Sequence, residues 1–432
     1  MKKIFFSILI FIGILSFGQN SKLKVYLKKD STAYLQFNGL GQIWVRYNQS
    51  NPGTMVYDSP KEHTFDIGLR RWRFSLQGKI TEKISYYTQF GQNNFNYLSK
   101  KYVGSFFHDA FMEYELKKRK LSIGAGLSGW SGLSRYASPS IGSIMSLDAP
   151  LYQQITNGIN DQFLRKLSIH AKGIVGKFNY RVALTTPMAV QTSSNYDPTI
   201  SRDATSFSSN APKLQYQGYF MYHFKETESN VTPYTTGTYL GTKSVVNLGA
   251  GVIYQPDALW SLNDNNDTIM HQMMAIGTDF YLDEPLTEKI VLTVYSAYHY
   301  FDFGNNYIKN IGVMNPATGS NKADVINGGG NAYPALGTGH SFYTQVGYLF
   351  RELNEEHAGV QPYLAAHFGD YDGLDELMSS YNIGVNYLFH GTHSGKLSLE
   401  LQNRPVFVGQ TDGRSKVEER MNMVVLQMQL SF

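Results

Sequence analysis

Long segments of this chain alternate apolar and polar residues with a period of two. In residues 33–48, Leu35 and Phe37 fall on one face of an extended strand, and Gln36 and Asn38 fall on the other. Such alternation is typical of a strand with one apolar and one polar face. Many of these segments reach about ten residues, the length that a tilted strand needs to cross a bilayer, whereas strands of soluble sandwiches average about five or six. The pattern therefore predicts membrane-spanning β-strands.

Strands in lipid must form a closed wall, because an open sheet edge would leave backbone groups unpaired in hydrocarbon. We predict an all-β, antiparallel, up-and-down transmembrane barrel of sixteen strands, an even number as in bacterial single-chain barrels. The predicted strands are 33–48, 64–80, 84–93, 104–117, 120–127, 163–174, 177–187, 213–225, 243–256, 268–283, 288–304, 338–350, 359–370, 376–391, 395–405 and 418–432.

The connections between these strands should alternate between short inner turns and long extracellular loops, with both chain ends in the periplasm. Residues 226–242 are the exception, since this connection is long where a short turn is expected. A hairpin hidden there would raise the strand count to eighteen.

Both ends of the chain indicate export to the outer membrane. Lys2 and Lys3 precede an apolar run over residues 4–17, typical of a signal peptide covering 1–18 and too short to span a bilayer. The last strand alternates to the terminal Phe432, as outer-membrane barrels do. We expect residues 19–432 to form one barrel domain among outer-membrane lipid and lipopolysaccharide. We also expect the barrel-assembly machinery to engage the last strand.

The composition argues against several other classes of protein. The chain has no cysteine, which excludes disulfides and a lipid-modified N-terminal cysteine. Its formal net charge of +4 falls by two when the signal lysines are removed, and this balance does not indicate nucleic-acid binding. The 31 tyrosines and the aromatic content of 14% suit the interface belts of a barrel.

The strand predicted over 64–80 carries an unusual group of arginines. Arg71, Arg73 and Lys79 share one face. A basic residue on the lipid face at mid-depth costs ~2–4 kcal/mol, so this face belongs in the lumen. Arg70 breaks the alternation, which predicts a β-bulge near residues 69–71.

Two interpretations of these arginines stay open. They form a rung that concentrates anions in the lumen, or they brace the wall by pairing with acids such as Asp109, Glu113 and Glu115. The same alternation places further charged residues in the lumen. These pore-lining candidates are Glu113, Lys166, His170, Lys172, Arg181, Asp279 and Glu400. The mixture of signs predicts a weak preference for anions.

The segment Phe65–Ile80, with its paired arginines, resembles a strand of the phosphate-selective porin O and P family. Residues 109–114 are similar to a following strand, and residues 237–243 with 247–254 resemble the Bacteroidetes branch of these porins. The resemblance implies a homotrimeric, sixteen-stranded channel whose third external loop folds inward as a constriction. The Pro-Phe-Gly run frequent in the family after strand five is absent here, and the lysine-rich inner path of the family has no residue-by-residue match. We therefore do not read phosphate specificity from the family name.

The third external loop on our strand count is 128–162, the longest loop of the chain. Its length and the family resemblance favour an inward fold over an external lid. Folded inward, the loop would set the pore size and field. Its candidate constriction residues are Trp130, Arg135, Asp148 and Asp161.

Patterns that resemble nucleotide-binding, calcium-binding, zinc-binding or hydrolase motifs lack the neighbouring residues or elements that those motifs require. The spacing Gly124-x-Gly126-x-x-Gly129 matches a dinucleotide fingerprint, but no helix pattern follows it. Residues 263–267 lack the glycine and distal glutamate of an EF-hand. No histidine spacing indicates a zinc site, and no histidine has a serine or acid in a hydrolase register. We expect no cofactor, no metal and no enzymatic activity.

The sequence thus favours an outer-membrane porin, a water-filled channel for passive diffusion of small polar solutes. An accessory barrel of a secretion or gliding assembly, its lumen filled by loops, is the alternative. An outer-membrane enzyme is a more distant third.

Overall fold

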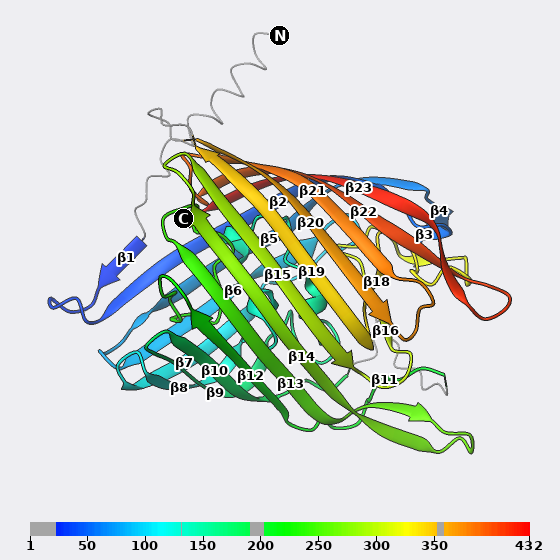
Figure 1. The fold of residues 1–432 in the computed structure, drawn as a ribbon, viewed down its shortest axis with the longest axis horizontal. Helices are drawn as coiled ribbons and strands as arrows, with labels where there is room; N and C mark the ends of the chain where they lie inside the picture. The colour runs from blue at the N-terminus through cyan, green and yellow to red at the C-terminus, as the bar shows by residue number, and fades with distance from the viewer. Residues whose placement is uncertain (1–22, 131, 191–202, 352–357) are drawn as a thin grey trace, which may run out of the picture.

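The computed structural model describes residues 23–130, 132–190, 203–351 and 358–432. It is a single tilted β-barrel whose strands run antiparallel around one lumen (Figure 1). The sixteen strands of the wall are β2 (Tyr34–Gln49), β5 (His63–Lys79), β6 (Ile84–Phe95), β7 (Phe106–Lys117), β8 (Leu121–Ser128), β9 (Lys166–Val175), β10 (Phe178–Thr186), β12 (Gln215–His223), β13 (Val245–Leu262), β14 (Thr268–Pro285), β15 (Ile290–Asp302), β19 (Gly339–Arg351), β20 (Gly359–Tyr371), β21 (Met378–Phe389), β22 (Gly395–Gly409) and β23 (Ser415–Ser431).

Further short elements do not span the wall. They are the strands β1 (Leu23–Tyr26), β3 (Thr54–Val56), β4 (Ser59–Pro60), β11 (Ser206–Phe207), β16 (Ile308–Ile311), β17 (Gly319–Ser320) and β18 (Tyr333–Gly337), and the 3-10 turns η2 (Arg135–Ala137), η3 (Ile141–Ser143) and η4 (Leu151–Gln153). Two of them extend the sheet of the wall, β1 by pairing with β2 and β11 by pairing with β13. No helix in the described ranges is long and apolar enough to cross a membrane. The predicted signal peptide, 1–18, falls outside those ranges.

The predicted count of sixteen strands is confirmed. Each predicted strand has one counterpart in the wall, and β23 pairs with β22 on one side and with β2 across the seam, as expected for the last strand. At that seam the backbones of Gly39 and Phe432 exchange hydrogen bonds of 2.9 and 3.1 Å. The alternative count of eighteen is wrong for the described residues, because the connection after β12 adds no strand to the wall.

The two faces of the wall follow the alternation in the sequence. On β23, Leu426 and Leu430 are about two-fifths exposed on the outside, whereas Gln427 and Gln429 are buried on the inside. Apolar side chains outside and hydrogen-bonded amides inside are what lipid on one face and a polar lumen on the other require. The same alternation of exposed and buried side chains runs along β19 and β20.

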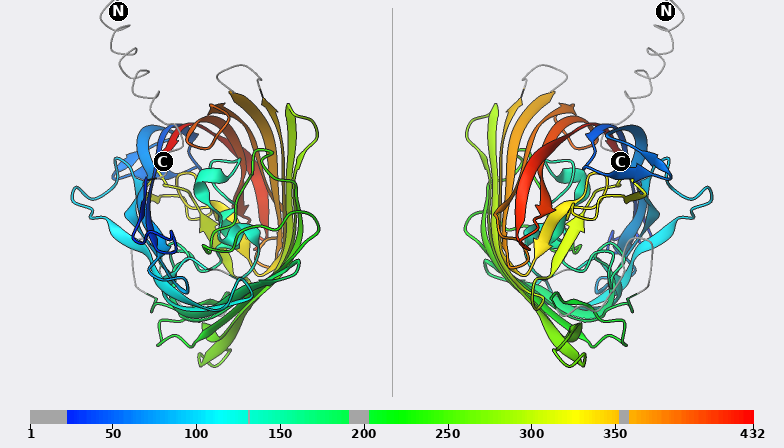
Figure 2. Two further views of the ribbon diagram at one scale, coloured as in Figure 1. Left: turned by 90° about the vertical axis from the view of Figure 1, so that its left-hand side faces the viewer. Right: turned by 90° about the vertical axis from the view of Figure 1, so that its right-hand side faces the viewer.

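Three connections fold into the lumen rather than away from it. They are loop L3 (129–165), loop L6 (303–338), and the strap, which we define as residues 224–244 between β12 and β13. Figure 2 looks along the barrel and shows L3 in cyan-green and L6 in yellow inside the ring of strands. The inward fold of the third loop is confirmed. The inward fold of L6 and of the strap was not predicted.

Loop L3 packs against one side of the wall through a buried apolar cluster. Tyr136 of η2 packs at a tilt against Tyr295 of β15 with ring centroids 4.1 Å apart, and Tyr152 of η4 stacks on His367 of β20 at the same distance. These side chains are almost fully buried. The half of the lumen next to β13, β14, β15, β19 and β20 is therefore filled by protein.

Loop L6 is held by two arginines of the wall. Arg46 of β2 pairs with Asp66 and donates hydrogen bonds to the carbonyl oxygens of Val313 and Met314, at 2.9 and 2.7 Å. Arg404 of β22 donates to the side-chain oxygen of Asn51 in L1 (50–62) and to the backbone carbonyl of Gly330 in L6, and it is fully buried. Both arginines therefore donate hydrogen bonds to backbone carbonyl groups of L6 and do not face open water.

Glycines on the inner wall let L3 lie directly on the strands. A Cβ atom at Gly251 of β13 would stand less than 3.0 Å from the carbonyl oxygens of Gly132 and Leu133. We expect Gly251→Ala to displace L3 and destabilise the folded barrel by about 1–3 kcal/mol, the usual cost of overpacking. The measurement is the temperature at which the purified barrel loses its compact electrophoretic band. Gly104→Ala, which meets nothing within 4 Å, is the control, and equal midpoints for both variants would contradict the prediction.

Candidate functional site: a basic cavity in the lumen

The most basic part of the lumen comes from strand β5. The pairing of β5 with β2 passes from Arg71 opposite Gln42 directly to Leu69 opposite Ile43, which leaves Arg70 as an extra residue. The predicted β-bulge is thus confirmed, and it turns Arg70 inward beside Arg71. Arg70, Arg71 and Arg73 all face the lumen and are at most 7% exposed.

Asp148 of L3 joins two of these arginines. Its Oδ1 lies 2.7 Å from Nη2 of Arg70 and also accepts a hydrogen bond from Arg71. Burial would raise the pKa of Asp148, but the charges of Arg70 and Arg71 outweigh burial and hold this pKa below its ordinary value. The carboxylate is therefore ionised at neutral pH. Its charge-assisted bonds fix L3 to β5, so the partner of Arg71 is a loop aspartate rather than one of the wall acids considered from the sequence.

Arg73 differs from its neighbours because only neutral groups contact it. Its Nε donates to Oδ1 of Asn93 at 2.9 Å, and its Nη1 lies 3.4 Å from Oε1 of Gln89. Within the described part of the chain it forms no ion pair with a carboxylate. The positive charge of Arg73 is therefore not neutralised by a contact.

Arg165, at the end of L3, faces Arg73 from across the cavity. Its Nη2 donates to the phenol oxygen of Tyr234 at 2.8 Å and lies 3.4 Å from Oδ2 of Asp109. The Tyr234 hydroxyl in turn donates to the Asp109 carboxylate, at 2.7 and 2.6 Å from its two oxygens. Burial, reinforced by Asp109, raises the pKa of Tyr234 well above its ordinary value, so this phenol stays neutral.

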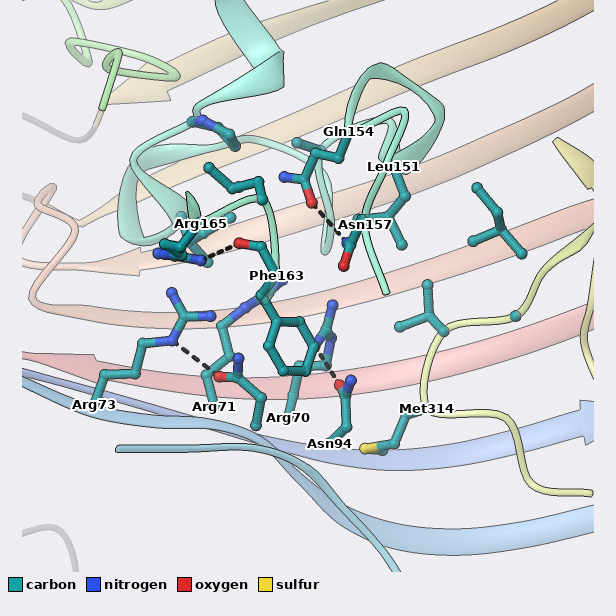
Figure 3. A pocket seen from close by; sticks show the side chains of 18 of the residues that line it. Arg70, Arg71, Arg73, Asn94, Leu151, Gln154, Asn157, Phe163, Arg165 and Met314 are labelled. Atoms are coloured by element: carbon teal, nitrogen blue, oxygen red, sulfur yellow. Dashed lines mark hydrogen bonds between the residues drawn. The ribbon is translucent and has the colours of Figure 1, made fainter. Parts of the chain in front are cut away.

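These arginines surround a cavity of about 220 Å³, which we call the arginine cavity. Figure 3 shows Arg70, Arg71 and Arg73 on its floor and Arg165 opposite, with Phe163 between them. Lys309 of L6 adds a fifth cation to the lining. The contacting acids are Asp148 and Asp109, so five cations face two carboxylates and the cluster carries three excess positive charges at neutral pH.

The strap crosses the lumen on the side of L3 that faces the chain ends. Glu228 forms a buried, bidentate ion pair with Arg135 of L3, with distances of 2.6 and 2.7 Å, and Arg135 also lies over the ring of Tyr281, 3.5 Å from its centroid. Burial would raise the pKa of Glu228, but Arg135 outweighs it and the pKa is lowered. The backbone carbonyl of Thr238 in the strap accepts a hydrogen bond from Nε2 of His393, in the turn between β21 and β22. The strap therefore holds L3 in place from the side that faces the chain ends.

A second cavity, of about 470 Å³, opens toward the chain ends, and we call it the terminal cavity. Lys79, Glu113 and Lys172 line it together with strap residues 227–232. Lys79 is partly exposed there and lies 3.9 Å from Glu115, away from Arg71 and Arg73. The predicted basic strand face thus spreads over two separate cavities.

The predicted basic row on β9 faces inward but is paired. Lys166 lies 3.5 Å from Asp161, which also accepts hydrogen bonds from the hydroxyl of Thr156 and the backbone N–H of Leu164. Glu113 lies 2.7 Å from the ammonium of Lys172 and 2.9 Å from Nε2 of His170. Arg181 of β10 is also buried, and it donates to the carbonyl of Pro233 at 2.6 Å.

Three other predicted residues hold L3 in place. Asp279 accepts the backbone N–H of Arg135 at 2.8 Å, and Glu400 accepts that of Leu147 at 3.3 Å. Trp130 packs against β10 and β12 in a small apolar cluster, far along L3 from Asp148. Of the four loop candidates, Asp148 alone contacts the arginines of the cavity among the described residues.

Sequence reasoning did not single out Arg165, Tyr234, Lys309 or Asn93. Arg165 directly precedes the predicted lumenal Lys166, so a basic pair at the loop end was a usable signal. Tyr234 lies in the connection 226–242, whose unexpected length raised a hidden hairpin as an alternative but gave no indication of an inward fold. Lys309 carried no signal, because nothing in the sequence indicates that L6 folds inward.

Among the described residues, no group of three or more His, Cys, Asp or Glu side chains is placed to hold a metal ion. The arrangement of the lumen is instead a cationic cavity between an outer loop and an inner strap. Chemically, it can attract and desolvate a small anion.

Comparison with known proteins agrees with this geometry. A sequence profile described as phosphate-selective porin O and P matches residues 39–333, more than half of the chain. A search of curated protein sequences returned no significant match.

Solved structures with the same fold include three outer-membrane proteins. The channel DcaP of Acinetobacter baumannii is 13% identical with a TM-score of 0.51, covering 94% of this chain and 99% of DcaP. OprB of Pseudomonas putida is 12% identical with a TM-score of 0.50, covering 93% and 94%. The anion-selective porin of Comamonas acidovorans is 10% identical with a TM-score of 0.50, covering 93% and 100%. At these identities the likeness shows the fold alone.

Proposed function

The chain belongs to the phosphate-selective porin O and P family of outer-membrane porins, and from that premise we propose that its arginine cavity selects small anions during passive diffusion. The observation that carries the proposal is the excess of three positive charges around a cavity inside the barrel lumen. A low-dielectric wall focuses this field and raises the local anion concentration. Arg73, whose contacts are neutral amides, supplies the least compensated charge.

The remaining pore-lining residues have supporting roles in this proposal. Lys166, His170, Lys172 and Arg181 are paired or bonded to carbonyls, so they shape the wall more than the field. Asp279 and Glu400 keep L3 in position. Solute class is set by charge and size, and no covalent chemistry is required of any side chain.

The export, assembly and location that we propose for this protein follow from the family and the sequence. Residues 1–18 direct export, and the barrel-assembly machinery recognises the last strand. The mature barrel stands in the outer membrane among lipid and lipopolysaccharide, with the terminal cavity on the periplasmic side. A homotrimer is proposed by analogy with the family.

Planar-bilayer recording tests the proposal. We expect stable single-channel conductance. Across a salt gradient, the sign of the reversal potential should show that anions are more permeant than cations. An accessory barrel is the second candidate, favoured by the protein that fills the half of the lumen beside β13 to β20. Lack of conductance from correctly folded protein would overturn the porin proposal and support the accessory barrel.

The anion preference should weaken at alkaline pH. Burial lowers the pKa of Lys309 to about 8, so its charge is present below that pH and is lost above it. Raising the pH from about 6 to about 10 should therefore move the reversal potential toward zero with a midpoint near 8. Lys309→Met should remove this transition. A transition of the same size in Lys309→Met would assign it to another group.

A further inference from the structure

The arginine cavity and the terminal cavity lie one behind the other along the same strands. On β5 the arginine cavity ends at Arg73 and the terminal cavity begins at Gln77. On β7 the terminal cavity begins at Phe111. The level between them is marked by Ser75 and Asp109, which line neither cavity. A solute that moves from one cavity to the other must cross this level.

Tyr234 of the strap stands at this level. It lines the arginine cavity, and its hydroxyl is bonded to Asp109 of the wall and to Arg165 of L3. Its ring centroid lies 6.1 Å from that of Tyr87, which lines the terminal cavity. The Tyr234 ring thus lies at the edge of the arginine cavity beside a ring that lines the terminal cavity, and its hydroxyl is bonded both to the wall and to L3.

The backbone on either side of Tyr234 is also fixed. The carbonyl of Pro233 accepts a bond from Arg181 at 2.6 Å. Thr235 donates its N–H to Ser138 of L3 at 2.9 Å and accepts the N–H of Ser140 at 2.8 Å. The ring is therefore held in place by its own hydroxyl and by bonds to L3 and the wall through the backbone.

We propose that Tyr234 is the size-determining residue of the pore, supplied from the periplasmic side by the strap. The proposal rests on the proposed porin function and adds a second constriction to the one made by L3. The phenol is neutral, so Tyr234 limits solute size, whereas the arginines behind it act on solute charge. The two properties should therefore be separable by mutation.

Tyr234→Ala in the full-length barrel should raise single-channel conductance by about two-fold or more, because a ring is removed from the level between the two cavities. Proteoliposomes should then swell in uncharged sugars too large for the wild type, whereas the reversal potential should stay close to that of the wild type. Tyr234→Phe keeps the ring and should keep the wild-type size limit. Wild-type conductance and size limit in Tyr234→Ala would overturn the proposal.

A control variant separates the ring from the strap. Tyr239 lies on the same strap and donates to Glu228 at 2.7 Å, but it lines neither cavity. Tyr239→Ala should leave the size limit unchanged. Equal widening in both variants would mean that a loosened strap, rather than the lost ring, changes the pore, and would overturn the proposal.

Chemical modification gives a second measurement. The chain has no natural cysteine, so Tyr234→Cys offers a unique thiol. A bulky methanethiosulfonate reagent should reduce the enlarged conductance of this variant, and a reductant should restore it. Labelling confirmed by mass without any change in current would contradict the proposal. Absence of conductance in the wild type would refute the porin function instead, so the two failures are distinguishable.

Discussion

The double substitution Arg71→Gln and Arg73→Gln is expected to move the reversal potential of the channel strongly toward cations. It removes two of the three excess charges around the arginine cavity. One unit charge at about 4 Å contributes roughly 1 kcal/mol even in a water-like medium, which is about a five-fold change in permeability ratio. Loss of two charges should therefore change the ratio of anion to cation permeability by roughly ten-fold or more.

The single variants separate selectivity from bracing. Arg73→Gln removes a charge that holds no carboxylate, so it should shift selectivity without affecting the stability of the barrel. Arg71→Gln also removes one of the two arginine partners of Asp148, so it should shift selectivity and loosen L3. Arg414, an exposed arginine paired with Asp412, supplies the control. If the double variant keeps the wild-type reversal potential and Arg414→Gln behaves identically, the arginines act as braces alone.

Glu228→Gln is expected to have the largest effect on the folded state. The substitution leaves the guanidinium of Arg135 buried with no carboxylate partner, and breaking a buried pair in this way costs about 3–5 kcal/mol. The clamp between the strap and L3 should then open part of the time. We expect a lower temperature for loss of the compact barrel band and a noisier single-channel current than in the wild type.

An exposed ion pair provides the matched control for this prediction. Lys225 and Glu284 lie 2.7 Å apart near the same end of the barrel, but their side chains are 47% and 23% exposed. Exposed pairs contribute about 0–1 kcal/mol, so Glu284→Gln should leave both readouts nearly unchanged. Equal behaviour of Glu228→Gln and Glu284→Gln would show that the strap does not clamp L3.

The sequence by itself determined the wall. Sixteen strands, the closure of β23 on β2 and the bulge at Arg70 could all be predicted, because the backbone of a strand alternates its side chains with a fixed period. Lipid on one side makes that alternation strict, since a misplaced charge is costly there. The inward direction of Arg71 and Arg73 followed from the same rule.

The tertiary structure decided what fills the lumen. Arg165, Tyr234 and Lys309 come from L3, the strap and L6, which have no periodicity to show which way a side chain points. Arg135, expected at the constriction, is instead bound to Glu228. These contacts join residues far apart in the chain, as with Tyr234 and Asp109 at a separation of 125 residues. Only closure of the barrel brings such residues within hydrogen-bonding distance, so local pattern fixes the wall and loop packing fixes the pore.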